Sequence, residues 1–150
     1  MHVLLRVGGS IEEPAFEPVH VAPLGGRSYQ VIFSPGLAYG IAADDEIEIQ
    51  DDGTYVVTCR GRNLAVRVLS PTSLAEHAQS LTSQVQQVLG GRLDGQVSKG
   101  LAFTIPIAAG FKQVEATFEQ FISRHPGTLW EYGNVYDENG NSLGWWQGEA

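Results

Sequence analysis

The residues with the clearest chemical potential form an acidic run near the middle of the chain. Six carboxylates fall within the nine positions 44–52, in the stretch AADDEIEIQDDG. Negative potential gathered in this way steers association with a positively charged partner. A solvated strand that resists aggregation is the plainer interpretation, because carboxylates about 7 Å apart on a strand repel each other by only about 0.6 kcal/mol in water. The candidate partner-binding acids are Asp44, Asp45, Glu46, Glu48, Asp51 and Asp52.

Residue types that bind metals or carry catalysis are present but form no recognisable pattern. The acidic run lacks the D-x-D-x-D-G order of a calcium loop, and Cys59 and the four histidines have no zinc-site spacing. The paired glycines match no phosphate-binding loop and are predicted to lie in turns. No Ser/His/Asp or Cys/His arrangement stands out. We therefore predict no cofactor, no metal and no enzymatic activity, and keep an unrecognised enzyme as a third alternative.

Aromatic residues form a second candidate site toward the C-terminal end. Trp130, Tyr132 and Tyr136 alternate along a predicted strand, and Trp145 and Trp146 follow on a returning strand. Either this aromatic face packs against the N-terminal part of the chain, or it is an exposed platform for a partner. We count Tyr132, Trp145 and Trp146 among the candidate partner-binding residues.

Around the acidic run, the pattern predicts a hairpin. Its loop is Asp51-Asp52-Gly53, a three-residue connection with glycine last, which is typical of a type I turn followed by a bulge. This register places Ile47 opposite Val57 on an inward face. The acids then stand on the outer face or at the strand ends, with Asp44 opposite Arg60.

The wider sequence pattern predicts an α+β protein in two parts. Residues 1–62 contain short apolar runs between turn residues, which indicates a small antiparallel β-barrel or sandwich lobe. From residue 63 the order strand, helix, strand, strand, helix, strand is the ferredoxin-like (βαββαβ) order. We predict helices over 71–89 and 111–125, and a C-terminal β-hairpin that pairs 128–136 with 142–146. The domains are thus 1–62 and 63–150, or one compact unit.

The overall charge narrows the class of partner. The net charge is −8, with 17 acidic residues against nine basic ones. Nucleic acid and anionic membrane repel such a chain, so we expect neither as a partner. The apolar run at the N-terminus is short for a signal peptide, and no apolar run is long enough to span a membrane, so we expect a cytoplasmic protein.

The stretch GLAYGIAADDEIEIQDDGTYVV resembles the uncharacterised bacterial family called domain of unknown function 4265. Ala38-Tyr39-Gly40 stands at that family's AYG turn, and Ala43-Asp44 stands where the family often has Gly-Asp. The resemblance extends to about the LWEY of 129–132, and the C-terminal extension departs from the usual shorter ending. It implies a two-lobed α+β protein with no established chemistry, so it transfers no catalytic residues.

Together these features favour a non-catalytic protein-binding inhibitor. We expect a bacterial immunity protein that neutralises a cognate, basic protein toxin by docking its acidic surface into a basic cleft. The alternative is a small-molecule sensor or regulatory domain that uses the crevice between the lobes. The sequence leaves the toxin, the ligand and the oligomeric state open.

Overall fold

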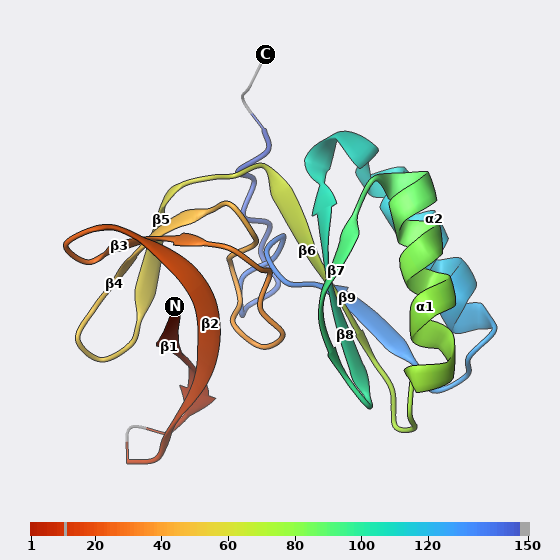
Figure 1. The fold of residues 1–150 in the computed structure, drawn as a ribbon, viewed down its shortest axis with the longest axis horizontal. Helices are drawn as coiled ribbons and strands as arrows, with labels where there is room; N and C mark the ends of the chain where they lie inside the picture. The colour runs from red at the N-terminus through yellow and green to blue at the C-terminus, as the bar shows by residue number, and fades with distance from the viewer. Residues whose placement is uncertain (11, 148–150) are drawn as a thin grey trace.

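The protein folds into two lobes, each built on an antiparallel sheet (Figure 1). The structure is a computed structural model that describes residues 1–10 and 12–147. The first lobe has only strands, and the second has a sheet with both helices on one face. The predicted α+β class is therefore confirmed.

The first lobe is an open sheet whose strands pair in chain order, β1-β2-β3-β4-β5. The strands are β1 (His2–Gly9), β2 (Pro14–Gly25), β3 (Ser28–Val31), β4 (Glu46–Ile49) and β5 (Tyr55–Cys59). No ladder joins β1 to β5 within the described residues, so of the two predicted forms, barrel or sandwich, the closed barrel is wrong. β3 and β4 have only four residues each. β1 instead meets the β4–β5 turn through a hydrogen bond from Arg6 N to Gly53 O (2.9 Å).

The second lobe has a four-stranded sheet in the order β7-β8-β6-β9. Its elements are β6 (Asn63–Leu69), α1 (Ala75–Gln84), β7 (Arg92–Val97), β8 (Gly100–Pro106), α2 (Phe111–Ser123) and β9 (Leu129–Tyr132). A π-helical segment, Val85–Leu89, continues α1, and a 3₁₀ turn, Ile107–Ala109, precedes α2. Pro106 fits in the central strand β8 because it is the last residue of that strand.

Each lobe has its own hydrophobic core. Alternation along β6 sends Leu64, Val66 and Val68 toward the helices and leaves Arg67 on the helix-free face. On α2, Val114, Phe118 and Phe121 face this core. The first-lobe core comprises Leu5, Val19, Val21, Val31, Ala38, Ile41 and Ile47.

The segment of residues 34–43 fills the space between the two sheets. It lies against the helix-free face of the second sheet, where Ser34 Oγ is 2.5 Å from Thr104 Oγ1 and Gly40 N donates to Gly133 O (2.8 Å). In Figure 1 this segment runs between the two sheets, in orange. We call residues 34–43 the seam segment.

Two charged side chains from opposite lobes hold the seam segment. Glu17 of β2 accepts hydrogen bonds from the backbone N–H groups of residues 36, 37 and 38, at 2.8–3.2 Å. Arg67 of β6 donates to the carbonyl oxygens of Leu37 and Ala38. Only 2% of Arg67 is exposed. Buried backbone N–H and C=O groups need hydrogen-bond partners. Glu17 and Arg67 provide such partners for the seam segment, which forms no strand.

The predicted C-terminal hairpin is reduced to a single bridge between Tyr136 and Ser142. β9 ends at Tyr132 because the Asn134 side chain replaces strand pairing: its Oδ1 accepts from Ala65 N (2.9 Å) and its Nδ2 donates to Asn63 O (2.8 Å). The predicted strand over 128–136 is therefore too long. Within the described part of the chain, no helix has the length and apolar character needed to cross a membrane.

Candidate functional site

The predicted hairpin register is present, but the acidic run does not form an exposed acidic edge. Ile47 pairs with Val57 as predicted, and a bulge then places Glu46 opposite Cys59. β4 is an inner strand, flanked by β3 and β5, so Glu46 and Glu48 are half-buried in the sheet. Asp44, Asp51 and Asp52 are exposed.

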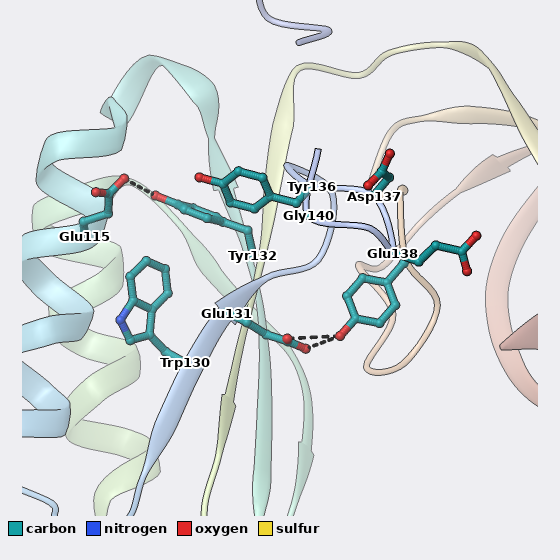
Figure 2. Close-up of a pocket in the computed structure, with 9 residues that line it drawn as sticks. Glu115, Trp130, Glu131, Tyr132, Tyr136, Asp137, Glu138 and Gly140 are labelled. Carbon is teal, nitrogen blue, oxygen red and sulfur yellow. Dashed lines mark hydrogen bonds between the residues drawn. The ribbon is translucent and has the colours of Figure 1, made fainter. Parts of the chain in front are cut away.

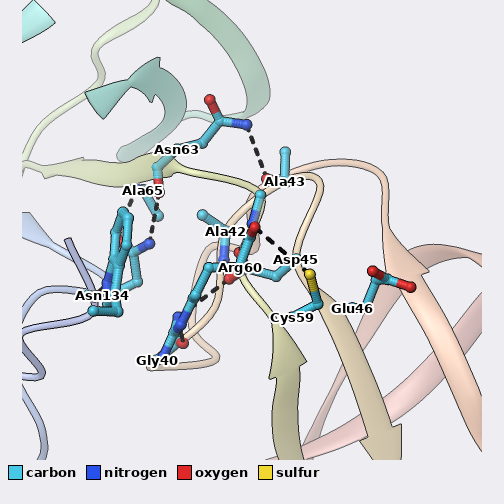
Figure 3. Close-up of polar contacts among 12 residues, drawn as sticks. Gly40, Ala42, Ala43, Asp45, Glu46, Cys59, Arg60, Asn63, Ala65 and Asn134 are labelled. Carbon is cyan, nitrogen blue, oxygen red and sulfur yellow. Dashed lines mark hydrogen bonds and ion pairs between the residues drawn. The ribbon is translucent and has the colours of Figure 1, made fainter. Parts of the chain in front are cut away.

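Asp45 was expected at the surface, but only 1% of it is exposed. Its carboxylate accepts hydrogen bonds from Ala42 N (2.9 Å) and Gly61 N (2.8 Å), and Arg60 Nη1 lies 3.3 Å away (Figure 3). Burial raises the pKa of Asp45, and these three donors oppose that shift. Asp45 therefore fastens the end of the seam segment to the link between the lobes, and it is not available to a partner.

The exposed acids of the run have local partners as well. Asp44 has a positive φ of 74° and accepts from Asn63 Nδ2 (3.1 Å). Asp51 pairs with Arg27 (2.7 Å) at the turn. Hydrogen bonds from the hydroxyl and the backbone N–H of Thr54 lower the pKa of Asp52. The run thus supports the hairpin and the lobe junction, which the sequence alone did not indicate.

Two residues of the predicted aromatic face, Trp130 and Tyr132, pack against α2, which neither of our two interpretations anticipated, whereas Tyr136 is exposed. Trp130 stacks on Phe118 of α2, with ring centroids 5.6 Å apart, and Tyr132 packs edge-on against Phe111. Their neighbour on the same strand, Glu131, points to the other side, toward the seam segment. The side of β9 that carries the aromatic rings is therefore the α2 side.

Trp145 and Trp146 are half-buried beside this core. Trp145 Nε1 donates to Asn134 O (2.8 Å), and the Arg60 guanidinium lies over its ring at 5.4 Å. The Trp146 ring packs edge-on against Phe111 at 5.0 Å. These contacts give both residues a structural role in covering the second lobe.

A pocket of about 650 Å³ lies where β9, α2, the C-terminal turn and the seam segment meet (Figure 2). Among the described residues, no Lys or Arg lines it. Four of its lining residues are acidic and four are aromatic. They are Glu115, Glu131, Asp137 and Glu138, with Tyr39, Trp130, Tyr132 and Tyr136, and Gly140 completes the wall. We call this the acidic pocket.

Hydrogen bonds fix the positions of two of the carboxylates. Tyr132 donates its hydroxyl to Glu115 (3.0 Å), and Tyr39 donates to Glu131 (2.8 Å). Burial and the adjacent carboxylates raise the pKa of both tyrosines, so their hydroxyls stay protonated and act as donors. The arrangement presents carboxylate oxygens already oriented beside aromatic rings.

The other two carboxylates come from the C-terminal turn. Asp137 accepts hydrogen bonds from Asn141 and Asn139, which lower its pKa. Glu138 is exposed and makes no hydrogen bond or ion pair with any described residue. The pocket therefore contains at least one carboxylate whose charge the protein itself does not compensate.

A second cavity lies at the crevice between the lobes. It has a volume of about 370 Å³, and its walls are mostly apolar. Glu17 and Arg67 line it, and Arg67 Nε has no hydrogen-bond partner in the described structure. The remaining lining residues are Ser34, Gly36, Leu37, Leu69, Gly95, Gln96, Val97, Gly100, Leu101 and Ala102. We call it the apolar crevice.

Of the residues predicted as partner-binding from the sequence, Tyr132 lines the acidic pocket and the others do not. Glu115 lies on the exposed side of α2, and Glu138 lies in the C-terminal turn after β9. Neither position has a sequence signal of its own, because the fold alone brings the two together. Within the described residues, no group of three or more His, Cys, Asp or Glu is placed to hold a metal ion.

Comparisons with known proteins agree with the resemblance found in the sequence. No curated protein matches the chain. A solved structure, described as "Novel crystal structure of a hypothetical protein from Neisseria gonorrhoeae", aligns with a TM-score of 0.66 at 13% identity, over 89% of this chain and 94% of that one. At this identity the likeness shows the fold alone. A family model described as "Domain of unknown function (DUF4265)" matches residues 17–132, and the chain therefore belongs to that family.

Proposed function

We propose that this protein is a non-catalytic binding protein that recognises a cationic group of a partner protein through the acidic pocket. The observation that carries the proposal is the lining of that pocket, which has four carboxylates and four aromatic rings and, among the described residues, no lysine or arginine. Carboxylates attract a cation, and aromatic faces add cation–π attraction.

The expected strength of this attraction follows from simple electrostatics. A cation about 5 Å from one carboxylate gains roughly 0.8 kcal/mol in water and about 3 kcal/mol at an effective dielectric constant near 20. Two such carboxylates account for at least a tenfold change in affinity. Salt screens exposed charges over about 8–10 Å, so binding should weaken as ionic strength rises.

We also infer that the second lobe has the ferredoxin-like arrangement. Its chain order, the sheet order β7-β8-β6-β9 and the two helices on one face support this. The seam segment lies against the other face of the sheet.

An immunity protein for a basic toxin is the most specific form of this proposal. In that form the acidic pocket, rather than residues 44–52, supplies the negative surface. The proposal rests on the pocket's charge and on the acidic composition of the chain, with a net charge of −8.

The test is affinity capture from native lysate with two matched variants. Glu115→Gln/Glu138→Gln removes two charges from the acidic pocket, and Glu12→Gln/Glu76→Gln removes two from exposed positions outside it. The proposal predicts a basic protein that the wild type and the control variant capture, but the pocket variant does not. Capture by all three proteins alike would contradict it.

A small-molecule sensor is the second candidate, and the apolar crevice favours it. Pockets of a few hundred Å³ with mostly apolar walls and few polar groups are typical ligand sites. The unpaired Nε of Arg67 offers one donor at its wall. Thermal-shift screening of metabolites separates the two functions. A metabolite that stabilises the wild type but not Leu69→Gln, a substitution in the wall of the apolar crevice, supports the sensor.

A further inference from the structure

We propose that the cationic group is an arginine side chain on an extended segment of the partner, and that this segment continues from the acidic pocket into a second pocket on the first lobe. This inference rests on the proposed function and names the ligand of the same site. It differs from the docking of a globular basic cleft because it predicts that a short peptide binds.

The protein already contains a guanidinium bound to part of this pocket. Arg67 lies over the Tyr39 ring, with Cζ 4.6 Å from the ring centroid, and its Nη1 is 3.7 Å from Glu131 Oε1. Arg67 is buried behind these two residues, which both also line the acidic pocket. The tyrosine–glutamate pair thus already holds one guanidinium from the interior side, which shows that a tyrosine ring and a carboxylate of this pocket suit that group.

Arginine suits this site better than lysine does. A guanidinium is planar, stacks on aromatic rings and donates to a carboxylate through two parallel N–H groups. The pocket supplies the Glu115 carboxylate oriented beside the Tyr132 ring, and on the other side of β9 the Glu131 carboxylate oriented beside the Tyr39 ring (Figure 2). An ammonium group attracts the same charges but uses less of this geometry.

A neighbouring cavity of about 370 Å³ continues the acidic pocket across the molecule. The two share Tyr39, Tyr136, Asp137 and Glu138, so they are parts of one groove. The second part, which we call the adjoining pocket, reaches β1 of the first lobe. Its other lining residues are Arg6, Val7, Gly8, Gly40, Tyr55 and Leu143.

The character of the groove changes along its length. The acidic pocket is anionic, whereas the adjoining pocket contributes Val7, Tyr55 and Leu143 as apolar or aromatic surface. Arg6 adds one positive charge there, opposite in sign to the shared carboxylates of Asp137 and Glu138. A partner segment that places an arginine in the acidic pocket can therefore place an apolar residue, a short distance along that segment, in the adjoining pocket. A residue of an extended chain advances about 3.3 Å, so a few residues cover adjacent pockets.

The experiment is calorimetric titration of the full chain with defined capped peptides. The reference peptide has a central arginine, a leucine two positions away on each side and glycine elsewhere, so either chain direction can place a leucine. One control peptide replaces the arginine by citrulline, its uncharged counterpart, and another replaces both leucines by glycine. The protein variants are Glu115→Gln/Glu138→Gln and Leu143→Ser, with Glu12→Gln/Glu76→Gln as the matched control.

The inference predicts that the reference peptide binds at least tenfold more tightly than either control peptide. Leu143→Ser should remove the advantage of leucine over glycine and keep that of arginine over citrulline. If leucine and glycine peptides bind equally while arginine still exceeds citrulline, the segment proposal is overturned and the proposed function stands. If neither peptide binds, the segment proposal is likewise overturned and the proposed function stands. If arginine and citrulline peptides bind equally well, the proposed function itself fails.

Discussion

Replacing Asp45 by Asn tests whether the acidic run is structural, because the change removes one charge and keeps the side chain's shape. An Asn side chain has one acceptor oxygen, whereas the Asp45 carboxylate accepts from two backbone N–H groups at 2.8 and 2.9 Å. One of these buried donors therefore loses its partner, at about 1–3 kcal/mol. We expect Asp45→Asn to lower the free energy of unfolding by this amount, measured by urea denaturation with tryptophan fluorescence.

Asp51→Asn is the matched control, since its carboxylate pairs with Arg27 but its side chain is 91% exposed. Exposed ion pairs typically contribute about 0.2–1 kcal/mol, so we expect a change at the low end of that range. If the two variants lose equal stability, Asp45 does not have the buried role assigned to it.

The same variant has a pH dependence of defined sign. Because burial raises the pKa of Asp45 in the folded state, the folded protein binds its proton more readily than the unfolded chain does. That contribution to stability is complete below the unfolded pKa and is lost as pH rises through the folded pKa. The difference in unfolding free energy between wild type and Asp45→Asn should therefore widen on acidification from neutral pH. A difference that narrows would contradict the raised pKa.

Three further substitutions test the lobes and their junction by the same denaturation assay. Arg67→Met leaves two seam-segment carbonyls without their donor, and we expect a loss of about 1–3 kcal/mol for each carbonyl left unpaired; a total loss below about 1 kcal/mol would contradict its role at the seam. Gly53→Ala adds a Cβ at φ +86° and 2.8 Å from a Phe16 ring carbon, so we expect a loss above about 1 kcal/mol; unchanged stability would argue against that turn. Phe118→Ala should lose about 3–5 kcal/mol and red-shift tryptophan emission, because Trp130 loses its stacked ring; unaltered emission would contradict the stacking.

The sequence predicted local structure well where one regular pattern determined it. The alternation of Ile47 and Ile49 fixed the register of the β4–β5 hairpin, and the 3–4 spacing of Val114, Phe118 and Phe121 fixed the buried face of α2. The extent of β9 was wrong because Asn134 replaces strand pairing with side-chain hydrogen bonds.

The positions of the acidic residues could not be predicted in the same way. Asp45 and its neighbours look alike in sequence. Asp45 differs from them in the folded chain because the link between the lobes brings the backbone N–H of Gly61 to its carboxylate. Similarly, Glu115 and Glu138 are 23 positions apart and meet at one pocket only in the folded chain. The composition predicts a cationic partner, and this stays a prediction, whereas the pocket itself could not be predicted from the sequence.

The most direct test of the central claim is an NMR titration with Nα-acetyl-arginine methylamide, following the indole N–H of Trp130. If the acidic pocket binds a guanidinium, this resonance shifts with the arginine probe and not with its citrulline counterpart. We also predict that Glu115→Gln/Glu138→Gln weakens binding of the arginine probe at least tenfold, while Glu12→Gln/Glu76→Gln does not. Equal shifts with both probes, or no shift with either, would contradict a cation-binding pocket at this position.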